Sequence, residues 1–152
     1  NSSLLASSDS SIPHGNYNEE NMKSTVVPFR NGILLSYPVA YAESIGYEAV
    51  ALGSHSGDHT IYPDCRPLFT TRMSEAASEG TFNRIQVVSP FNNISKGEIV
   101  KIGHSLGIDT IMSKTWTCYE GKSIHCGLCG ACRERKEAFL FAHVKDQTKY
   151  EN

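Results

Sequence analysis

The feature that most constrains this chain is a cluster of cysteines. Four of its five cysteines lie in the stretch CYEGKSIHCGLCGAC, which we call the cysteine loop (residues 118–132). Two-residue spacings let successive thiolates point at one ion, and Gly127 and Gly130 let the backbone turn tightly around it. Four sulfurs suit a tetrahedral structural site. We therefore predict that one zinc ion is held by Cys118, Cys126, Cys129 and Cys132.

Other uses of these cysteines are weaker. Nothing in the sequence indicates secretion, which disfavours disulfides because intracellular thiols are mostly kept reduced. An iron–sulfur cluster remains a rival, but the bacterial ferredoxin run has its fourth Cys downstream before Pro, whereas here the fourth lies upstream. His125 could replace one sulfur, yet we expect it to face solvent. Four cysteines complete the coordination shell of zinc, so the ion would stabilise the loop rather than activate water.

Length and charge exclude several classes of protein. The chain has 152 residues, 39% of them hydrophobic, which is enough for one globular domain with a core. Fourteen Lys and Arg against sixteen Asp and Glu give a net charge of -2. This balance offers no bulk attraction to nucleic acid or to an anionic bilayer. No apolar run approaches the length of a membrane span, and we expect a cytoplasmic protein.

The chain divides into a leader and one domain. Residues 1–25 are rich in Ser and Asn, which predicts a flexible linker or residual N-terminal segment. Residues 26–152 are expected to form one domain that contains the cysteine loop. Periodicity predicts helices and strands there. The helices are expected within 31–46, 67–80, 95–108 and 131–144, and the strands within 47–53 and 81–91.

Three local signals refine these helices. Asn31 is a good N-cap for the first helix, and Pro38 predicts a kink or a start nearer Tyr37. Ser95 and Glu98 have the spacing of a capping box. Helices alternating with short apolar strands favour an α/β fold with a parallel sheet. Two strands are too few for such a sheet to stand alone, so we expect an incomplete sheet whose N-terminal part is missing.

Several motifs together resemble one enzyme family. The stretches VPFRNGILLS, YPDCRPLF, SKGEIVKIG and TWTCY, with the cysteine spacing, are similar to the 7-cyano-7-deazaguanine synthases of queuosine biosynthesis, from about Val26 to Phe141. The resemblance implies the ATP pyrophosphatase group and its Rossmann-like sheet of the adenine nucleotide alpha hydrolase type. It also implies ATP-dependent conversion of 7-carboxy-7-deazaguanine and ammonia to the nitrile, with Mg²⁺ beside ATP, structural zinc and a homodimer.

The chain departs from this family at one motif. The family carries a Ser-Gly-Gly-x-Asp-Ser pyrophosphate loop, whereas this sequence contains no Gly-Gly pair, and SHSGDH at 54–59 lacks the second glycine. We therefore expect residues 26–152 to be the C-terminal part of a synthase domain that is inactive alone.

Candidate substrate residues lie in two segments. Arg30 and Asn31 lie at the expected start of a helix, where they can face a nucleotide phosphate. From the residues alone, a surface charge and a helix cap would be the preferred interpretation. The family resemblance favours the phosphate-binding role instead. The loop after the first strand is where ligands collect in open α/β sheets. An acid there can accept hydrogen bonds from a guanine-like edge, and an arginine can pair with the substrate carboxylate. The loop candidates are Asp58, Tyr62, Asp64, Cys65 and Arg66.

Two residues are candidates for the chemistry. Cys65 could act as a nucleophile, but a lone buried Cys is more often a packing residue, so we favour site lining. The charges of its neighbours Asp64 and Arg66 should shift the pKa of its thiol in opposite directions. Lys96, at a helix N-terminus, could neutralise charge on a phosphate, as the family's recurrent Ser-Lys pair implies; otherwise it is an exposed lysine. His55, His59 and His104 are expected to be solvated.

Two further functions stay open. An ATP pyrophosphatase that modifies tRNA with sulfur would use Cys65 as a persulfide carrier. A zinc-knuckle interaction module would do no chemistry, but YPDCRP, with an acid, a thiol and a base in one loop, disfavours it, as does the lack of a basic surplus.

Overall fold

The computed structural model of the protein describes residues 2–5 and 7–151. The chain forms two compact units. Unit 1 consists of Asn1–Val27 and Ser95–Asn152, and unit 2 of Pro28–Ile94. Among the described helices, none combines the length and apolar character that crossing a membrane requires.

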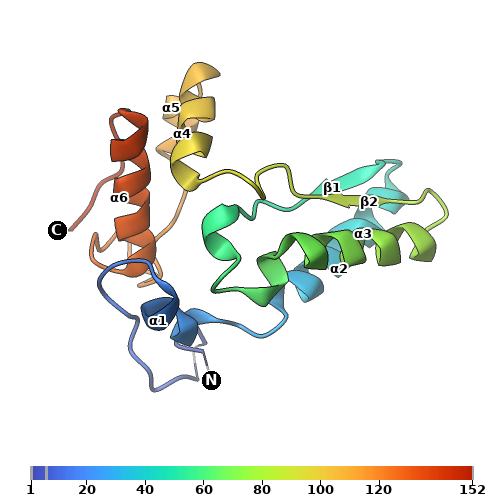
Figure 1. The fold of residues 1–152 in the computed structure, drawn as a ribbon, viewed down its shortest axis with the longest axis horizontal. Helices are drawn as coiled ribbons and strands as arrows, with labels where there is room; N and C mark the ends of the chain where they lie inside the picture. Colours follow the sequence, from blue (N-terminus) through green and yellow to red (C-terminus); the bar gives the residue numbers. More distant parts are fainter. Residues whose placement is uncertain (1, 6, 152) are drawn as a thin grey trace. The chain divides into compact units, whose positions relative to one another are not determined.

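Unit 2 contains a parallel pair of strands and two long helices (Figure 1). Strand β1 (Ala49–Ala51) pairs with β2 (Gln86–Val88) in parallel, with Val50 opposite Val87. Helix α3 (Pro67–Gly80) spans the predicted range 67–80 and has Pro67 in its first turn. It packs against β2 through Ser74, whose Oγ accepts the Val87 N–H at 2.9 Å. The predicted α/β class and parallel pairing are confirmed.

The strands are less covered than their apolar sequences predict. Val87 is buried, but Val50 is half-buried, and Ala49, Ala51 and Val88 are exposed. The apolar run at 47–53 favours a buried strand, but β1 is mostly exposed, because a sheet of two strands leaves its edges and part of its faces open.

Helix α2 (Arg30–Ser44) begins earlier than expected. Its N-cap is Phe29, in the left-handed region at φ 55°, and Pro38 lies inside the helix, so the predicted cap at Asn31 and the alternative start near Tyr37 are wrong. The Phe29 ring packs edge-on against Phe69, with centroids 5.9 Å apart. A Cβ on Gly32 would lie 2.3 Å from the Phe29 ring. This packing sets the first residue of α2, which helix propensity alone does not predict.

Unit 1 is built on two packed helices, α4 (Lys96–Ser105) and α6 (Gly130–Ala142). The capping box is confirmed, since the Ser95 hydroxyl accepts the Glu98 N–H and the Glu98 carboxylate accepts the Ser95 N–H. Where α4 meets α6, the Phe141 ring lies against Gly97. The short helix α5 (Asp109–Met112) follows α4.

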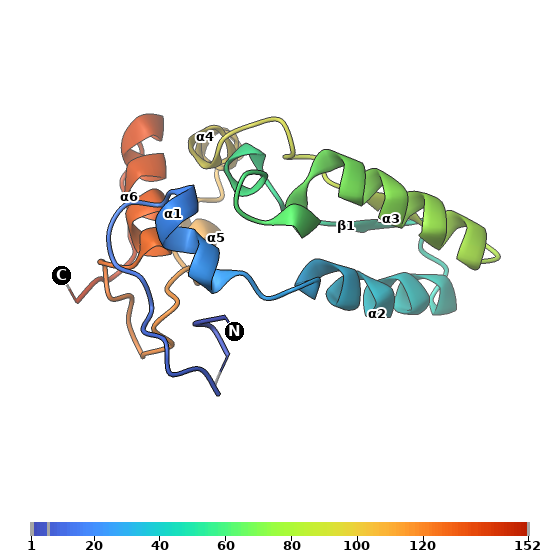
Figure 2. The same cartoon turned by 60° about the horizontal axis from the view of Figure 1, so that its bottom comes forward.

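The leader folds back on α6. It contains α1 (Glu19–Met22), which Figures 1 and 2 both show beside the start of α6. Met22 and Thr25 are completely buried, and a Cβ on Gly130 would lie 2.4 Å from the Met22 sulfur. These buried side chains anchor part of the leader in unit 1, and its flexibility stays a prediction.

Candidate functional site

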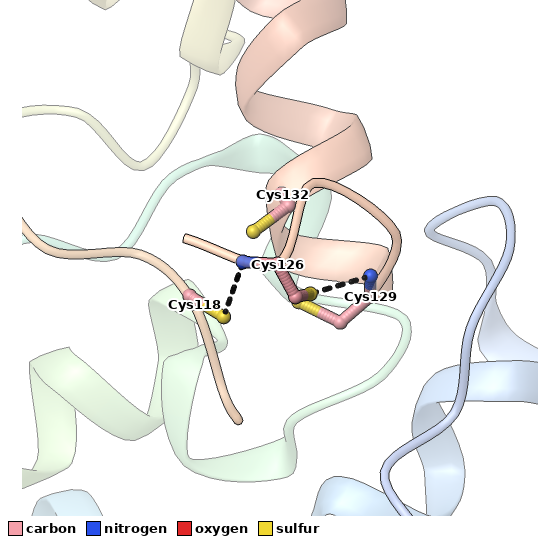
Figure 3. Close-up of side chains that lie close together, drawn as sticks. All are labelled: Cys118, Cys126, Cys129 and Cys132. Atoms are coloured by element: carbon pink, nitrogen blue, oxygen red, sulfur yellow. Dashed lines mark hydrogen bonds between the residues drawn. The ribbon is translucent and has the colours of Figure 1, made fainter. Parts of the chain in front are cut away.

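The four cysteines of the loop meet at one point in unit 1. Their sulfur atoms all lie within 4.8 Å of one another, and all four side chains are buried. Figure 3 shows the side chains converging, with Cys118 on its own segment and Cys129 and Cys132 at the start of α6. The predicted convergence is confirmed.

Backbone amides surround these sulfurs. The Cys126 N–H donates to the Cys118 sulfur at 3.3 Å, and the Cys129 N–H donates to the Cys126 sulfur at 3.3 Å (Figure 3). The Leu128 N–H also donates to the Cys126 sulfur, at 3.4 Å. Burial works to raise the pKa of Cys126, but the hydrogen bonds from the Cys129 and Leu128 amides and those with the thiols of Cys118 and Cys129 together lower the pKa to about 7. Amide donors of this kind stabilise a thiolate, which is the form that binds metal.

Cys129 and Cys132 lose their protons less readily than an ordinary thiol. Burial raises the pKa of Cys132 above its ordinary value, and also that of Cys129. Four thiolates this close repel one another, and a bound divalent cation offsets both the burial and the repulsion. Four buried sulfurs fit zinc in a closed tetrahedral site, which leaves no position for a reacting water.

His125 is buried rather than solvent-facing, so that expectation is wrong. Its Nε2 accepts the Thr117 N–H at 3.1 Å, and its ring lies 4.3 Å from the Trp116 ring and 5.7 Å from the Tyr150 ring. Burial lowers its pKa, and the charge of Arg135 lowers it further. His125 therefore supports the loop as a neutral packing residue.

Two residues beside the sulfurs had no sequence signal. The Nε2 of His14 lies 2.9 Å from Oε1 of Glu120, and both lie near the Cys126 sulfur. The Gly15 N–H donates to the Leu128 carbonyl at 3.1 Å, which ties the leader to the loop. His14 and Glu120 are 106 positions apart, so no local pattern could reveal this contact.

Unit 2 brings three of the predicted substrate residues into direct contact. The backbone N–H of Asn31 donates to Oδ2 of Asp64 at 2.8 Å. Its side-chain amide donates to the Asp64 carbonyl at 3.0 Å and to the Cys65 sulfur at 3.2 Å. All three residues are buried. Asp64, which is 33 positions from Asn31 in the sequence, therefore accepts a hydrogen bond from a backbone N–H in the first turn of α2. This is the helix-capping role that we predicted for Asn31.

The Cys65 thiol is held protonated. Burial is the largest cause, the charges of Asp58 and Asp64 add to it, and together they raise the pKa from 9.0 to about 12. The amide of Asn31 and the charge of Arg30 act in the opposite direction. A neutral thiol is a weak nucleophile, so this environment favours the lining role.

The cation that acts on Cys65 is not the one we predicted. Arg66 is exposed, and its Nε donates to the His59 carbonyl at 3.1 Å. The positive charge that lowers the pKa of Cys65 is that of Arg30.

The loop that carries Cys65 contains two short 3₁₀ turns, η2 (Ser56–Asp58) and η3 (Pro63–Cys65). Between them the Tyr62 N–H donates to the Asp58 carbonyl at 2.8 Å.

Two loop histidines are less solvated than expected. His55 is buried. Its ring Nδ1 accepts the Gly57 N–H at 3.1 Å, and its backbone N–H donates to Asp58 Oδ2 at 3.0 Å. His59 Nε2 is buried and has no hydrogen-bond partner among the described residues. His104 is exposed, as expected, beside Asp109.

Lys96 lies in unit 1, whereas the other candidate substrate residues lie in unit 2. It is the first residue of α4, and its Nζ pairs with the carboxylate of Glu134 on α6 and lies 5.6 Å from the centre of the Tyr17 ring. The lysine therefore already has a counter-ion. Its role toward a phosphate stays a prediction.

Comparison with known proteins places this arrangement in a family. A family model described as queuosine biosynthesis protein QueC matches residues 1–143. The chain belongs to the QueC family. The expected family relationship is thus confirmed.

Curated QueC relatives share about half of the sequence. A 7-cyano-7-deazaguanine synthase of Desulfotalea psychrophila is 51% identical over 149 residues, covering 98% of this chain and 67% of the relative. One from Porphyromonas gingivalis is 51% identical, covering 97% and 66%, and one from Psychromonas ingrahamii is 48% identical, covering 99% and 67%. The chain spans about two thirds of the length of these relatives.

Proposed function

We propose that this chain is part of a cytoplasmic enzyme that makes 7-cyano-7-deazaguanine from 7-carboxy-7-deazaguanine and ammonia, with ATP and Mg²⁺. The observation that carries the proposal is the 48 to 51% identity, over nearly the whole chain, to relatives named 7-cyano-7-deazaguanine synthase. These 152 residues contain no Gly-Gly pair and so no Ser-Gly-Gly-x-Asp-Ser pyrophosphate loop, and we propose that they do not catalyse the reaction by themselves.

The proposed chemistry explains the need for ATP. A carboxylate is a poor acyl donor, so its oxygen attacks the α-phosphate of ATP and releases pyrophosphate. Ammonia then displaces AMP from the acyl adenylate and leaves an amide. A second ATP adenylates the amide oxygen and releases another pyrophosphate. That oxygen then departs within AMP as the nitrogen gives up its two protons and the nitrile forms.

Residues of unit 2 are the proposed substrate contacts. Arg30 is exposed at the start of α2, where it and the helix amides can meet an anion. Arg66 is exposed at the end of the loop and can pair with the substrate carboxylate. The unpartnered Nε2 of His59 supports a ligand in this loop, because a buried polar atom without a partner is costly to keep.

Asp64 and Asn31 have a positioning part in this proposal. Their hydrogen bonds hold the Cys65 turn against the first turn of α2. A carboxylate has about four acceptor positions. One hydrogen bond to Asn31 therefore leaves Asp64 capacity for a guanine-like edge as well.

Zinc is assigned a structural part. The closed set of four sulfurs holds the start of α6 to the segment that carries Cys118, and α6 in turn carries Glu134, the partner of Lys96. We propose that the metal thereby places Lys96 for contact with a phosphate group. When bound, zinc supplies the positive charge that keeps the four thiolates together.

A mass-spectrometric assay tests the proposed function. The intact protein that carries this sequence is incubated with 7-carboxy-7-deazaguanine, ammonium, ATP and Mg²⁺, and the nitrile, AMP and pyrophosphate are measured. We expect all three products, and at least a tenfold lower kcat/KM for Arg30→Gln. The exposed Arg72→Gln on α3 is the matched control and should keep wild-type activity.

The competing functions predict different results. A tRNA-sulfur enzyme would transfer sulfur to tRNA through Cys65, form no nitrile and lose all activity in Cys65→Ser. A zinc-knuckle module would consume no ATP. Either result from the intact protein would replace the synthase proposal.

A further inference from the structure

The C-terminal segment of unit 1 lies against the cysteine loop. We call residues 145–151, which follow α6, the strap. The Glu151 N–H donates to the His125 carbonyl at 2.8 Å, and the Glu151 carboxylate pairs with Lys122 Nζ at 3.1 Å. Tyr150 forms a parallel bridge with His125. The strap is thus paired with the residue that directly precedes Cys126.

The strap is also anchored on α6 by an ion pair. Asp146 Oδ2 lies 3.4 Å from Arg135 Nε, and the Tyr150 hydroxyl donates to the same carboxylate oxygen at 2.5 Å. Arg135 Nε also donates to the Thr148 hydroxyl at 3.0 Å. Arg135 is only 6% exposed, so water competes little for these contacts.

Arg135 holds a third segment as well. Its terminal nitrogens donate to the Met112 carbonyl at 2.9 Å and to the hydroxyls of Thr115 and Thr117 at 2.8 and 3.3 Å. Thr117 directly precedes Cys118. One buried guanidinium therefore connects α6, the segment that carries Cys118 and the strap.

We propose that the strap retains the metal of the cysteine loop. Cys132 lies in α6 and Cys129 is its N-cap, whereas Cys118 and Cys126 lie in the preceding segments, outside the helix. A metal ion leaves such a site when ligands depart in turn, which requires these segments to open. The strap bonds the residue preceding Cys126 to α6, so opening requires the strap to detach first.

Zinc release to a chelator tests the proposal. The zinc-loaded protein is mixed with excess 4-(2-pyridylazo)resorcinol at neutral pH, and the coloured zinc complex is followed with time. We expect at least tenfold faster release from a chain that ends at Val144, and several-fold faster release from Tyr150→Phe, which loses only the bond to Asp146. Lys149→Ala, an exposed change within the strap, should release zinc at the wild-type rate.

A second control separates the strap from general stability. Gly97→Ala should destabilise unit 1 where α4 meets α6, because its Cβ meets the Phe141 ring, and neither residue takes part in the strap contacts described above. The proposal is overturned if Gly97→Ala releases zinc as fast as the shortened chain, or if the folded shortened chain releases it at the wild-type rate. If the shortened chain does not fold, Tyr150→Phe decides, and wild-type release from it overturns the proposal. A wild-type protein that binds no zinc also overturns it.

Discussion

Replacing Asp64 by Ala should loosen the first turn of α2. The substitution removes the buried carboxylate that accepts the Asn31 N–H at 2.8 Å. A hydrogen bond to a charged group contributes about 1.5–3 kcal/mol. The favourable placement of a negative charge at a helix N-terminus is part of this interaction. We therefore expect a loss of about 2 kcal/mol, which is roughly a 30-fold change in the opening equilibrium.

Hydrogen exchange followed by mass spectrometry measures this change. Peptides from the start of α2 should exchange roughly 30-fold faster in Asp64→Ala. Asp64→Asn keeps an acceptor but loses the charge, and should show a smaller effect of about 1 kcal/mol. Asp9→Ala removes an exposed carboxylate from unit 1 and should leave α2 unchanged. The reasoning is refuted if Asp64→Ala leaves exchange at the start of α2 within about threefold of the wild type.

Three further predictions concern other parts of the chain. Because the pKa of Cys65 rises from 9.0 to about 12, the folded state holds the thiol proton more tightly than the unfolded state. The contribution of this proton to the free energy of unfolding is therefore complete below about pH 9 and is lost toward pH 12. Urea unfolding across that range should show this loss in the wild type and a weaker pH dependence in Cys65→Ala, and equal slopes would contradict it. Asp146→Asn leaves the buried Arg135 without its counter-ion and should cost about 3–5 kcal/mol, measured by Trp116 fluorescence during unfolding. A cost below about 1 kcal/mol would show that water already screens this pair. In Gly97→Ala the new Cβ meets the Phe141 ring at 2.3 Å and should cost about 1–3 kcal/mol by thermal unfolding, whereas Gly80→Ala, with nothing within 4 Å, should be neutral or slightly stabilising. Equal effects of the two substitutions would exclude the packing explanation.

Local signals predicted the parts of the fold that depend on neighbours in sequence. The capping box at Ser95 and Glu98 sets the start of α4, and Pro67 sets the start of α3. The cysteine cluster was predictable for the same reason, since three of its four cysteines fall within seven positions of the chain.

Contacts between distant residues could not be predicted in this way. Phe29 takes a left-handed conformation at the N-cap of α2, where its ring packs on Phe69. His125 is buried because Tyr150 covers it from the C-terminal segment. The ion pair between Lys96 and Glu134 spans 38 positions, so no local pattern predicts it. All of these features are matters of burial or pairing, which the tertiary fold decides and sequence periodicity does not report.

The measurement that tests the account most directly is a native mass spectrum of the protein. The account predicts the mass of one zinc ion per chain with four deprotonated sulfurs, and loss of that ion in Cys126→Ser but not in Cys65→Ser. A metal-free chain whose mass has fallen by the hydrogens lost to disulfides would contradict the account, as would the mass of an iron–sulfur cluster.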